Sequence, residues 1–300
     1  MATQNNVPTT KRSTAQKEVT TPTSAITALS RDASKDFIGL SFSGCGFLGS
    51  YHFGVMLCFQ KHAKNLLSRI THFSGSSAGS LIAALMVLSP GCLQEGLNQM
   101  CDLAGELERL RFGAVTPGFN LANRMTGIVD RFIPENVSAA NGRLFISLTK
   151  QTDRTNHIVS IFTDRHHLLD CLNASCYIPY YSVGLLTTNI NPPEIDGCYY
   201  IDGGFSNNLP IIEDIPTITV SPFSGSAMIS PEDTKAIFDW KVVLGNQVIN
   251  VSRQNIVRAA QSLFPPNTQL LNDYYEIGFR NAMKFLQDNE LFERPDGDPV

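Results

Sequence analysis

The sequence has 300 residues, of which 43% are hydrophobic, and its formal net charge is −4 with an isoelectric point near 5.9. This length and apolar content suffice for one large core or two small ones. The slightly acidic balance, without clustered lysines and arginines, excludes the basic surface typical of a nucleic-acid-binding protein. Seven cysteines, an odd number without Cys-x-x-Cys spacing, favour a reducing compartment over a disulfide or zinc framework.

The first 35 residues are rich in serine and threonine and have almost no large apolar side chains. We expect a disordered N-terminal tail over residues 1–35, with a mitochondrial presequence as the alternative. Apolar runs are far shorter than the roughly 18 to 20 residues that cross a bilayer, and no secretory signal is evident. The expectation is an intracellular protein with one folded domain at 36–292 and a C-terminal tail at 293–300.

A strand predicted at 36–42 is followed by a glycine-rich loop at 43–49 that opens a helix through about Lys61. The loop has Gly-x-Gly-x-x-Gly spacing, which in a dinucleotide site requires an acidic residue about 20 positions later. No aspartate or glutamate occurs in 37–94. We therefore expect the loop to present backbone N–H groups to an anion, as an oxyanion hole does.

Five small residues join a predicted strand at 70–73 to a predicted helix at 81–88, and they are Gly75, Ser76, Ser77, Ala78 and Gly79. This is the layout of a nucleophile elbow, in which the glycines allow a sharp turn and the central Ser77 exposes its hydroxyl at a helix N-terminus. Alone, the pattern also occurs in non-catalytic strand-to-helix turns, so further residues must support it.

Apolar periodicity predicts helices at 92–111, 121–132, 164–176, 249–264 and 270–287, and strands at 143–149, 157–162, 198–201 and 217–220. The loop at 112–119 is a candidate wall of a substrate mouth. The alternation of strands and helices predicts an α/β sandwich with a mainly parallel sheet.

A serine hydroxyl becomes a nucleophile when a base accepts its proton. No histidine follows Asp202, which excludes a Ser-Asp-His order with that acid. An alternative uses a histidine with an earlier acid, drawn from His157, His166 and His167 with Asp102, Asp130 and Asp153. The favoured base is Asp202 itself, although Asp-Gly alone is more often a simple turn. Burial would raise the pKa of this carboxylate toward a useful value.

The three glycine-rich segments 44–49, 75–79 and 202–204 resemble the oxyanion, nucleophile and catalytic-aspartate motifs of the patatin-like phospholipases. Further segments resemble the adiponutrin and adipose triglyceride lipase subgroup, at 51–52, 175–179, 207–210, 219–225 and 263–266. The resemblance covers about 37–292. Ser76 departs from it, because this subgroup usually has alanine there.

The resemblance implies a three-layer α/β sandwich with Ser77 as nucleophile and Asp202, followed by Gly203 and Gly204, as proton acceptor. It implies an oxyanion hole from backbone amides of Gly44, Cys45, Gly46, Phe47, Leu48 and Gly49. The implied reaction is hydrolysis of lipid carboxylic esters, chiefly triacylglycerol but also phospholipid or retinyl ester, with transacylation to an alcohol acceptor. No metal or cofactor is implied.

The implied partners are a lipid droplet or membrane surface, contacted peripherally from the cytoplasm, and an activator protein. The chain ends soon after the last predicted helix, which makes droplet targeting a weaker expectation than hydrolysis. In length it resembles the short member of the subgroup, for which retinyl esters are implied substrates. The alternative function is a catalytically silent lipid-binding or regulatory protein of the same fold, against which the intact Ser77, Asp202 and glycines argue.

Overall fold

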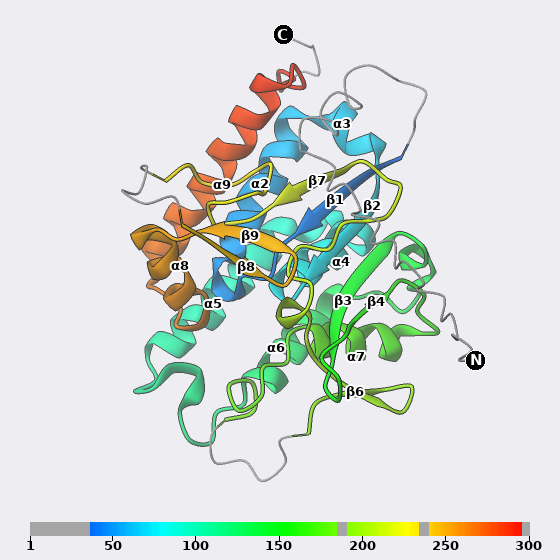
Figure 1. Cartoon of the computed structure of the whole chain (residues 1–300), viewed down its shortest axis with the longest axis vertical. Helices are drawn as coiled ribbons and strands as arrows, with labels where there is room; N and C mark the ends of the chain where they lie inside the picture. Colours follow the sequence, from blue (N-terminus) through cyan, green and yellow to red (C-terminus); the bar gives the residue numbers. More distant parts are fainter. Residues whose placement is uncertain (1–36, 185–190, 234–239, 296–300) are drawn as a thin grey trace, which may run out of the picture.

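A mixed, mostly parallel β-sheet forms the centre of the computed structural model, which describes residues 37–184, 191–233 and 240–295 (Figure 1). Within that part of the chain, the strand order is β5-β6-β3-β2-β1-β7, and β4 also pairs with β3. The predicted tail at 1–35 lies outside the described residues. Glu293, predicted to begin the C-terminal tail, is buried and accepts hydrogen bonds from two backbone amides of α3, so it belongs to the folded part.

The strands of the central sheet are β1 (Ile38–Phe42), β2 (Ile70–Ser76), β3 (Leu144–Lys150), β4 (Asn156–Val159), β5 (Glu194–Ile195), β6 (Cys198–Asp202) and β7 (Thr217–Val220). A separate antiparallel hairpin consists of β8 (Lys241–Leu244) and β9 (Gln247–Asn250). The helices are α2 (Gly49–His62), α3 (Lys64–Arg69), α4 (Ala78–Leu88), α5 (Leu93–Glu108), α6 (Leu121–Val129), α7 (Arg165–Ser175), α8 (Arg253–Leu263) and α9 (Thr268–Asp288). The predicted α/β class with a mainly parallel sheet is confirmed.

The two faces of the sheet differ because side chains alternate along a strand. One face is apolar and packs against α4, which contacts β1, β2 and β3 and is followed outward by α2, α5 and α9. The other face carries glycine, serine and threonine, so the irregular segment 206–216 can lie directly on it. Ser74 donates a hydrogen bond to the Pro210 carbonyl at 2.7 Å, and Ser147 donates to that of Asn207 at 2.9 Å.

Strand β3 aligns two other strands end to end. Its residues 146–147 pair with both β2 and β4, which must therefore occupy opposite edges. Its residues 148–149 pair with both β4 and β6, so β6 lies on the same edge as β2. Ser76 at the end of β2 faces Ser147, and Asp202 at the end of β6 faces Leu148. The carboxyl ends of β2 and β6 therefore lie next to each other, because they pair with adjacent residues of β3.

The sequence-predicted helix at 249–264 is wrong in its first turn. Ile249 and Asn250 belong to β9, where they pair with Val242 and Lys241. The helix begins only after Ser252, whose hydroxyl accepts a hydrogen bond from the Asn255 amide and so caps the N-terminus. Among the described residues, no helix has both the length and the apolar character that crossing a membrane would require.

Candidate active site

Ser77 occupies the turn between β2 and α4, as the sequence predicts for a nucleophile. Strand β2 runs to Ser76 and α4 begins at Ala78, so the turn is tighter than the predicted elements suggested. Ser77 has φ of 52° and ψ of −130°, a conformation that costs a non-glycine residue about 1 to 3 kcal/mol. A Cβ atom at Gly75 would collide with the backbone of Gly79, and one at Gly79 with that of Phe42. Both glycines are therefore required for the approach of β2, α4 and β1.

The backbone around Ser77 is held by two neighbouring serines. The Ser77 amide donates a hydrogen bond to the Ser175 hydroxyl at 2.9 Å, and that hydroxyl in turn donates to the Ser147 carbonyl at 2.9 Å. The Ser80 hydroxyl donates to the Ser77 carbonyl at 2.7 Å. These bonds support the strained turn, and they leave the Ser77 side chain free to face the cavity.

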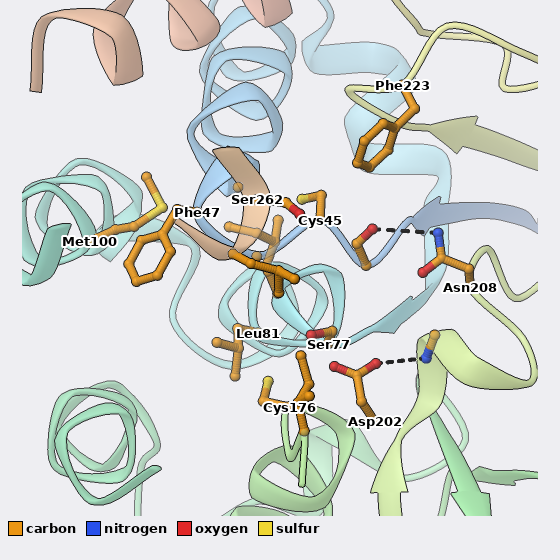
Figure 2. A pocket seen from close by; sticks show the side chains of 18 of the residues that line it. Cys45, Phe47, Ser77, Leu81, Met100, Cys176, Asp202, Asn208, Phe223 and Ser262 are labelled. Atoms are coloured by element: carbon orange, nitrogen blue, oxygen red, sulfur yellow. Dashed lines mark hydrogen bonds between the residues drawn. The ribbon is translucent and has the colours of Figure 1, made fainter. Parts of the chain in front are cut away.

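Asp202 lies opposite Ser77, at the end of β6 (Figure 2). Its side chain is 5% exposed, and one carboxylate oxygen accepts a hydrogen bond from the Gly204 amide at 2.7 Å. Burial raises the pKa of Asp202 to about 6, while hydrogen bonds from the Ser77 hydroxyl and the Gly204 amide oppose part of the increase. The carboxylate is thus ionised at neutral pH but basic enough to accept a proton.

The glycine-rich loop packs against the same cavity, but half of its amides are already used. The Gly44 amide donates to the Asn208 carbonyl, the Leu48 amide to the Cys45 carbonyl, and the Gly49 amide to the Gly46 carbonyl. The other amides of the loop, those of Cys45, Gly46 and Phe47, have no hydrogen-bond partner within the described part of the chain. These three, at the start of the 3-10 turn Gly46–Leu48, are the amides of the predicted oxyanion set that remain available.

The loop is fixed from both sides by buried groups. His52 is fully buried, its Nε2 donates to the Ser43 carbonyl at 2.9 Å, and burial lowers its pKa to about 4. Gly46 has φ of 53°, and a Cβ atom there would collide with the backbone of Ser262 at the end of α8. The loop therefore has little freedom to move away from Ser77.

Asn208 connects this loop to the β8–β9 hairpin. Its side-chain amide donates to the Gly44 carbonyl at 3.4 Å (Figure 2). It also donates to Gln247 Oε1 at 2.8 Å. Gln247 continues the network by donating to the Ser221 hydroxyl at 2.7 Å. Asn208 and Gln247 are buried, and sequence reasoning gave neither of them a role. The signal available for Asn208 was its place in segment 207–210, which resembles the subgroup, whereas Gln247, after Gly245 and Asn246, had none.

A predominantly apolar cavity of about 640 Å³ opens beside the dyad, a volume in the usual range for small-molecule sites. Ser77, Asp202 and the loop line it, together with apolar side chains of α4, α5, α6 and α8. The predicted mouth loop at 112–119 does not line it. The Cys176 thiol lies beside Ser77 and Asp202, but burial raises its pKa, which keeps it protonated.

The histidine alternatives do not reach the nucleophile. No histidine of the described residues lines the cavity. His157 stacks on Tyr200 on the outer strands, and His167 accepts a hydrogen bond from the Thr163 amide at the start of α7. Of the acidic partners considered for them, Asp130 forms an ion pair with Arg165 at 2.7 Å. Asp202 is the acid that the fold brings to Ser77.

Comparison with known proteins identifies the family of the chain. Residues 40–215 match the family model described as patatin-like phospholipase. The human patatin-like phospholipase domain-containing protein 4 is 38% identical over 257 residues, which are 85% of this chain and 99% of that protein. Mouse patatin-like phospholipase domain-containing protein 2 is 38% identical over 258 residues, 85% of this chain but 51% of that protein.

Two relatives are named for acyl transfer. A human 1-acylglycerol-3-phosphate O-acyltransferase is 35% identical over 85% of this chain and 52% of its own length. A human omega-hydroxyceramide transacylase is 35% identical over 83% of this chain.

The crystal structure of VipD from Legionella pneumophila aligns with 85% of this chain and 67% of that chain, at a TM-score of 0.39 and 12% identity. On its sequence and its matched domain, the chain belongs to the patatin-like phospholipase family of lipid hydrolases and acyltransferases.

Proposed function

We propose that this protein is a serine esterase that hydrolyses lipid carboxylic esters, chiefly triacylglycerol. The observation that carries the proposal is the position of Ser77, on a strained turn and facing the buried Asp202 at an apolar cavity. Phospholipid and retinyl esters, which have the same ester bond and apolar chains, belong to the same proposal. The membership of the family supports this class of substrate.

In the proposed reaction, the Ser77 oxygen attacks the ester carbonyl carbon while Asp202 accepts the hydroxyl proton. The developing oxyanion is stabilised by the available amides of Cys45, Gly46 and Phe47, and each such donor is typically worth about 3 to 4 kcal/mol. As the carbon–oxygen bond to the alcohol breaks, protonated Asp202 returns the proton to the leaving alkoxide. An acyl-serine remains.

Water or a second alcohol then attacks this acyl-serine while Asp202 accepts its proton, and Asp202 returns that proton to the Ser77 oxygen as the bond between acyl carbon and Ser77 breaks. Water gives hydrolysis, and an alcohol gives transacylation. The names of the acyltransferase and transacylase relatives support the second route. We place the reaction in the cytoplasm at the surface of lipid droplets or membranes, with an activator protein as a further expected partner.

The test is labelling of the purified chain by a fluorophosphonate probe, followed by assays on emulsified triacylglycerol, phospholipid and retinyl ester. We expect Ser77→Ala to abolish labelling and to lower hydrolysis by roughly 10⁴-fold or more. Ser68→Ala, at an exposed serine of α3, is the matched control and keeps both. A folded wild-type protein that takes no label would overturn the proposal and favour the silent lipid-binding alternative.

A further inference from the structure

Helix α8 presents its apolar side chains to solvent and its polar side chains to the protein. Asn255 and Arg258 are its buried residues. By contrast, Ile256 is 66% exposed, Val257 is 45% exposed, and Phe264, just after the helix, is 58% exposed. With Ala260 and Leu263, these residues follow i, i+1, i+4, i+7, i+8 spacing, which forms one apolar stripe. A surface helix of a soluble domain normally has the opposite orientation.

Buried polar contacts hold α8 in this orientation. Arg258 forms an ion pair with Asp233 at 2.7 Å, and its guanidinium also donates to the Asn255 side chain. Asn255 accepts a hydrogen bond from the Ser224 amide at 3.1 Å and donates to the Ser224 carbonyl at 2.8 Å. Rotating the helix to bury the apolar stripe would break these bonds and leave Asp233 without its charge partner, which is costly.

The apolar stripe continues into the mouth of the active-site cavity. Six apolar residues both line the cavity and are exposed to solvent: Phe205, Val242, Leu244, Val251, Ile256 and Leu263. They come from the turn after Asp202, the β8–β9 hairpin, the link that follows it and α8. The hairpin and α8 lie side by side (Figure 1). The exposed face is thus the rim through which a substrate passes. Exposed apolar surface of this kind marks an interaction site.

The charge of this region is opposite to that of the chain as a whole. Residues 240–272 contain Lys241, Arg253 and Arg258 but no aspartate or glutamate, whereas the full chain has a net charge of −4. Arg258 is neutralised by Asp233, so the exposed Arg253 supplies the basic character. A basic residue beside an apolar stripe fits an anionic lipid surface, where it contributes favourably near the headgroups.

We infer that the face formed by α8 and the β8–β9 hairpin docks the cavity mouth onto a phospholipid surface that contains anionic headgroups. The inference rests on the proposed function for its purpose, because apolar esters reside in such a surface. Docking in this orientation passes a substrate from the lipid phase to Ser77 without exposing its chains to water. The binding itself needs no catalysis and is tested separately.

Trp240 provides the readout, since it is the single tryptophan of the chain, is 66% exposed, and directly precedes β8. The full chain with Ser77→Ala, which cannot consume the lipid, is mixed with phosphatidylcholine vesicles with and without phosphatidylserine. We expect the Trp240 emission to shift to shorter wavelength and the protein to sediment with the anionic vesicles. Arg253→Gln should reduce partitioning to anionic vesicles by roughly fivefold and to neutral vesicles little.

Val257→Asp with Phe264→Asp should reduce partitioning at least roughly tenfold. Neither side chain lines the cavity, so kcat/KM on a water-soluble short-chain ester should stay at the wild-type value while hydrolysis of emulsified ester falls. Phe37→Asp, at a side chain 60% exposed before β1, is the control and binds vesicles as the parent chain does.

Two results would overturn the docking inference: no vesicle binding by the parent chain, or equal binding by the Asp variants. Dimerisation in the absence of lipid that the Asp variants abolish would instead assign the face to a second copy of the chain. A folded wild-type protein that binds vesicles but hydrolyses no ester would overturn the proposed function and leave the docking inference standing.

Discussion

At the scale of single residues, the proposed role of Asp202 as proton acceptor imposes two opposing requirements. Burial near Ser77 gives it the basicity that proton transfer needs, and its pKa of about 6 follows from that burial. The same burial disfavours the ionised form on which the reaction depends. Activity and stability should therefore respond to pH in opposite senses at this carboxylate.

Activity should fall in acid, because only ionised Asp202 can accept the Ser77 proton. We expect kcat/KM on a water-soluble ester to be constant above about pH 7 and to fall roughly tenfold per pH unit below about 6. A pH profile measured with a short-chain ester checks this. A midpoint near 4, the ordinary value for aspartate, would contradict a raised pKa of the base.

Stability should change the other way. Because the pKa of Asp202 is raised on folding from 3.8 to about 6, the neutral carboxyl contributes stability that is complete below pH 3.8 and is lost as pH rises through 6. Asp202→Asn should therefore raise the free energy of unfolding at pH 8 by up to roughly 3 kcal/mol, and at pH 4 by little. Denaturant unfolding at both pH values measures the difference, and a variant destabilised at pH 8 would contradict it.

At the scale of elements, the β8–β9 hairpin reaches the catalytic loop through Gln247 and Asn208. Asn208 accepts a hydrogen bond from the Gly44 amide with its backbone carbonyl and donates one to the Gly44 carbonyl from its side chain. We propose it as a positioning residue for the amides of residues 45–47. A small displacement of such donors weakens the transition state more than the bound substrate.

We expect Asn208→Ala to lower kcat on a soluble ester roughly 10- to 100-fold with KM within a few-fold of wild type. The midpoint of its pH profile should stay near 6, because Asp202 keeps its own contacts. Gln247→Ala should act in the same direction and less strongly. A variant that loses activity only through KM, or that shifts the pH midpoint, would show that Asn208 acts by another route.

The elements that the sequence predicts well are those with local signals. The glycines of the elbow and the alternation of β3 and β4 depend on nearby residues, and the corresponding elements are present. The hairpin was missed although Gly245 and Asn246, a favourable turn pair, separate two short apolar runs. The last two residues of β9 were included in the helix predicted at 249–264, and the cap at Ser252 decides the boundary. Contacts such as that of Ser175 with Ser77 join residues 98 positions apart, which no local pattern reports.

At the scale of the whole molecule, the sheet separates two functions. Its apolar face supports the helical layer, and its small, polar face receives the extended segment that carries Asn208. The proposed dyad lies where the ends of β2 and β6 meet, and the cavity beside it is also lined by residues of the hairpin and of α8. The residue types of the dyad could be predicted from motifs. Their proximity, the cavity and its exposed rim depend on packing that the sequence alone does not define.

The shared edge of β3 has a consequence for relatives whose motifs are intact. Ser77 and Asp202 come together only because β2 and β6 pair with adjacent residues of the same strand. A slip of β6 by one residue would displace Asp202 by about 3.3 Å and turn its side chain to the other face of the sheet. A single-residue insertion within β6 could therefore extinguish catalysis with every motif letter unchanged. In this fold, a relative can therefore be inactive because one strand is shifted in its pairing, although all of its motif residues are present.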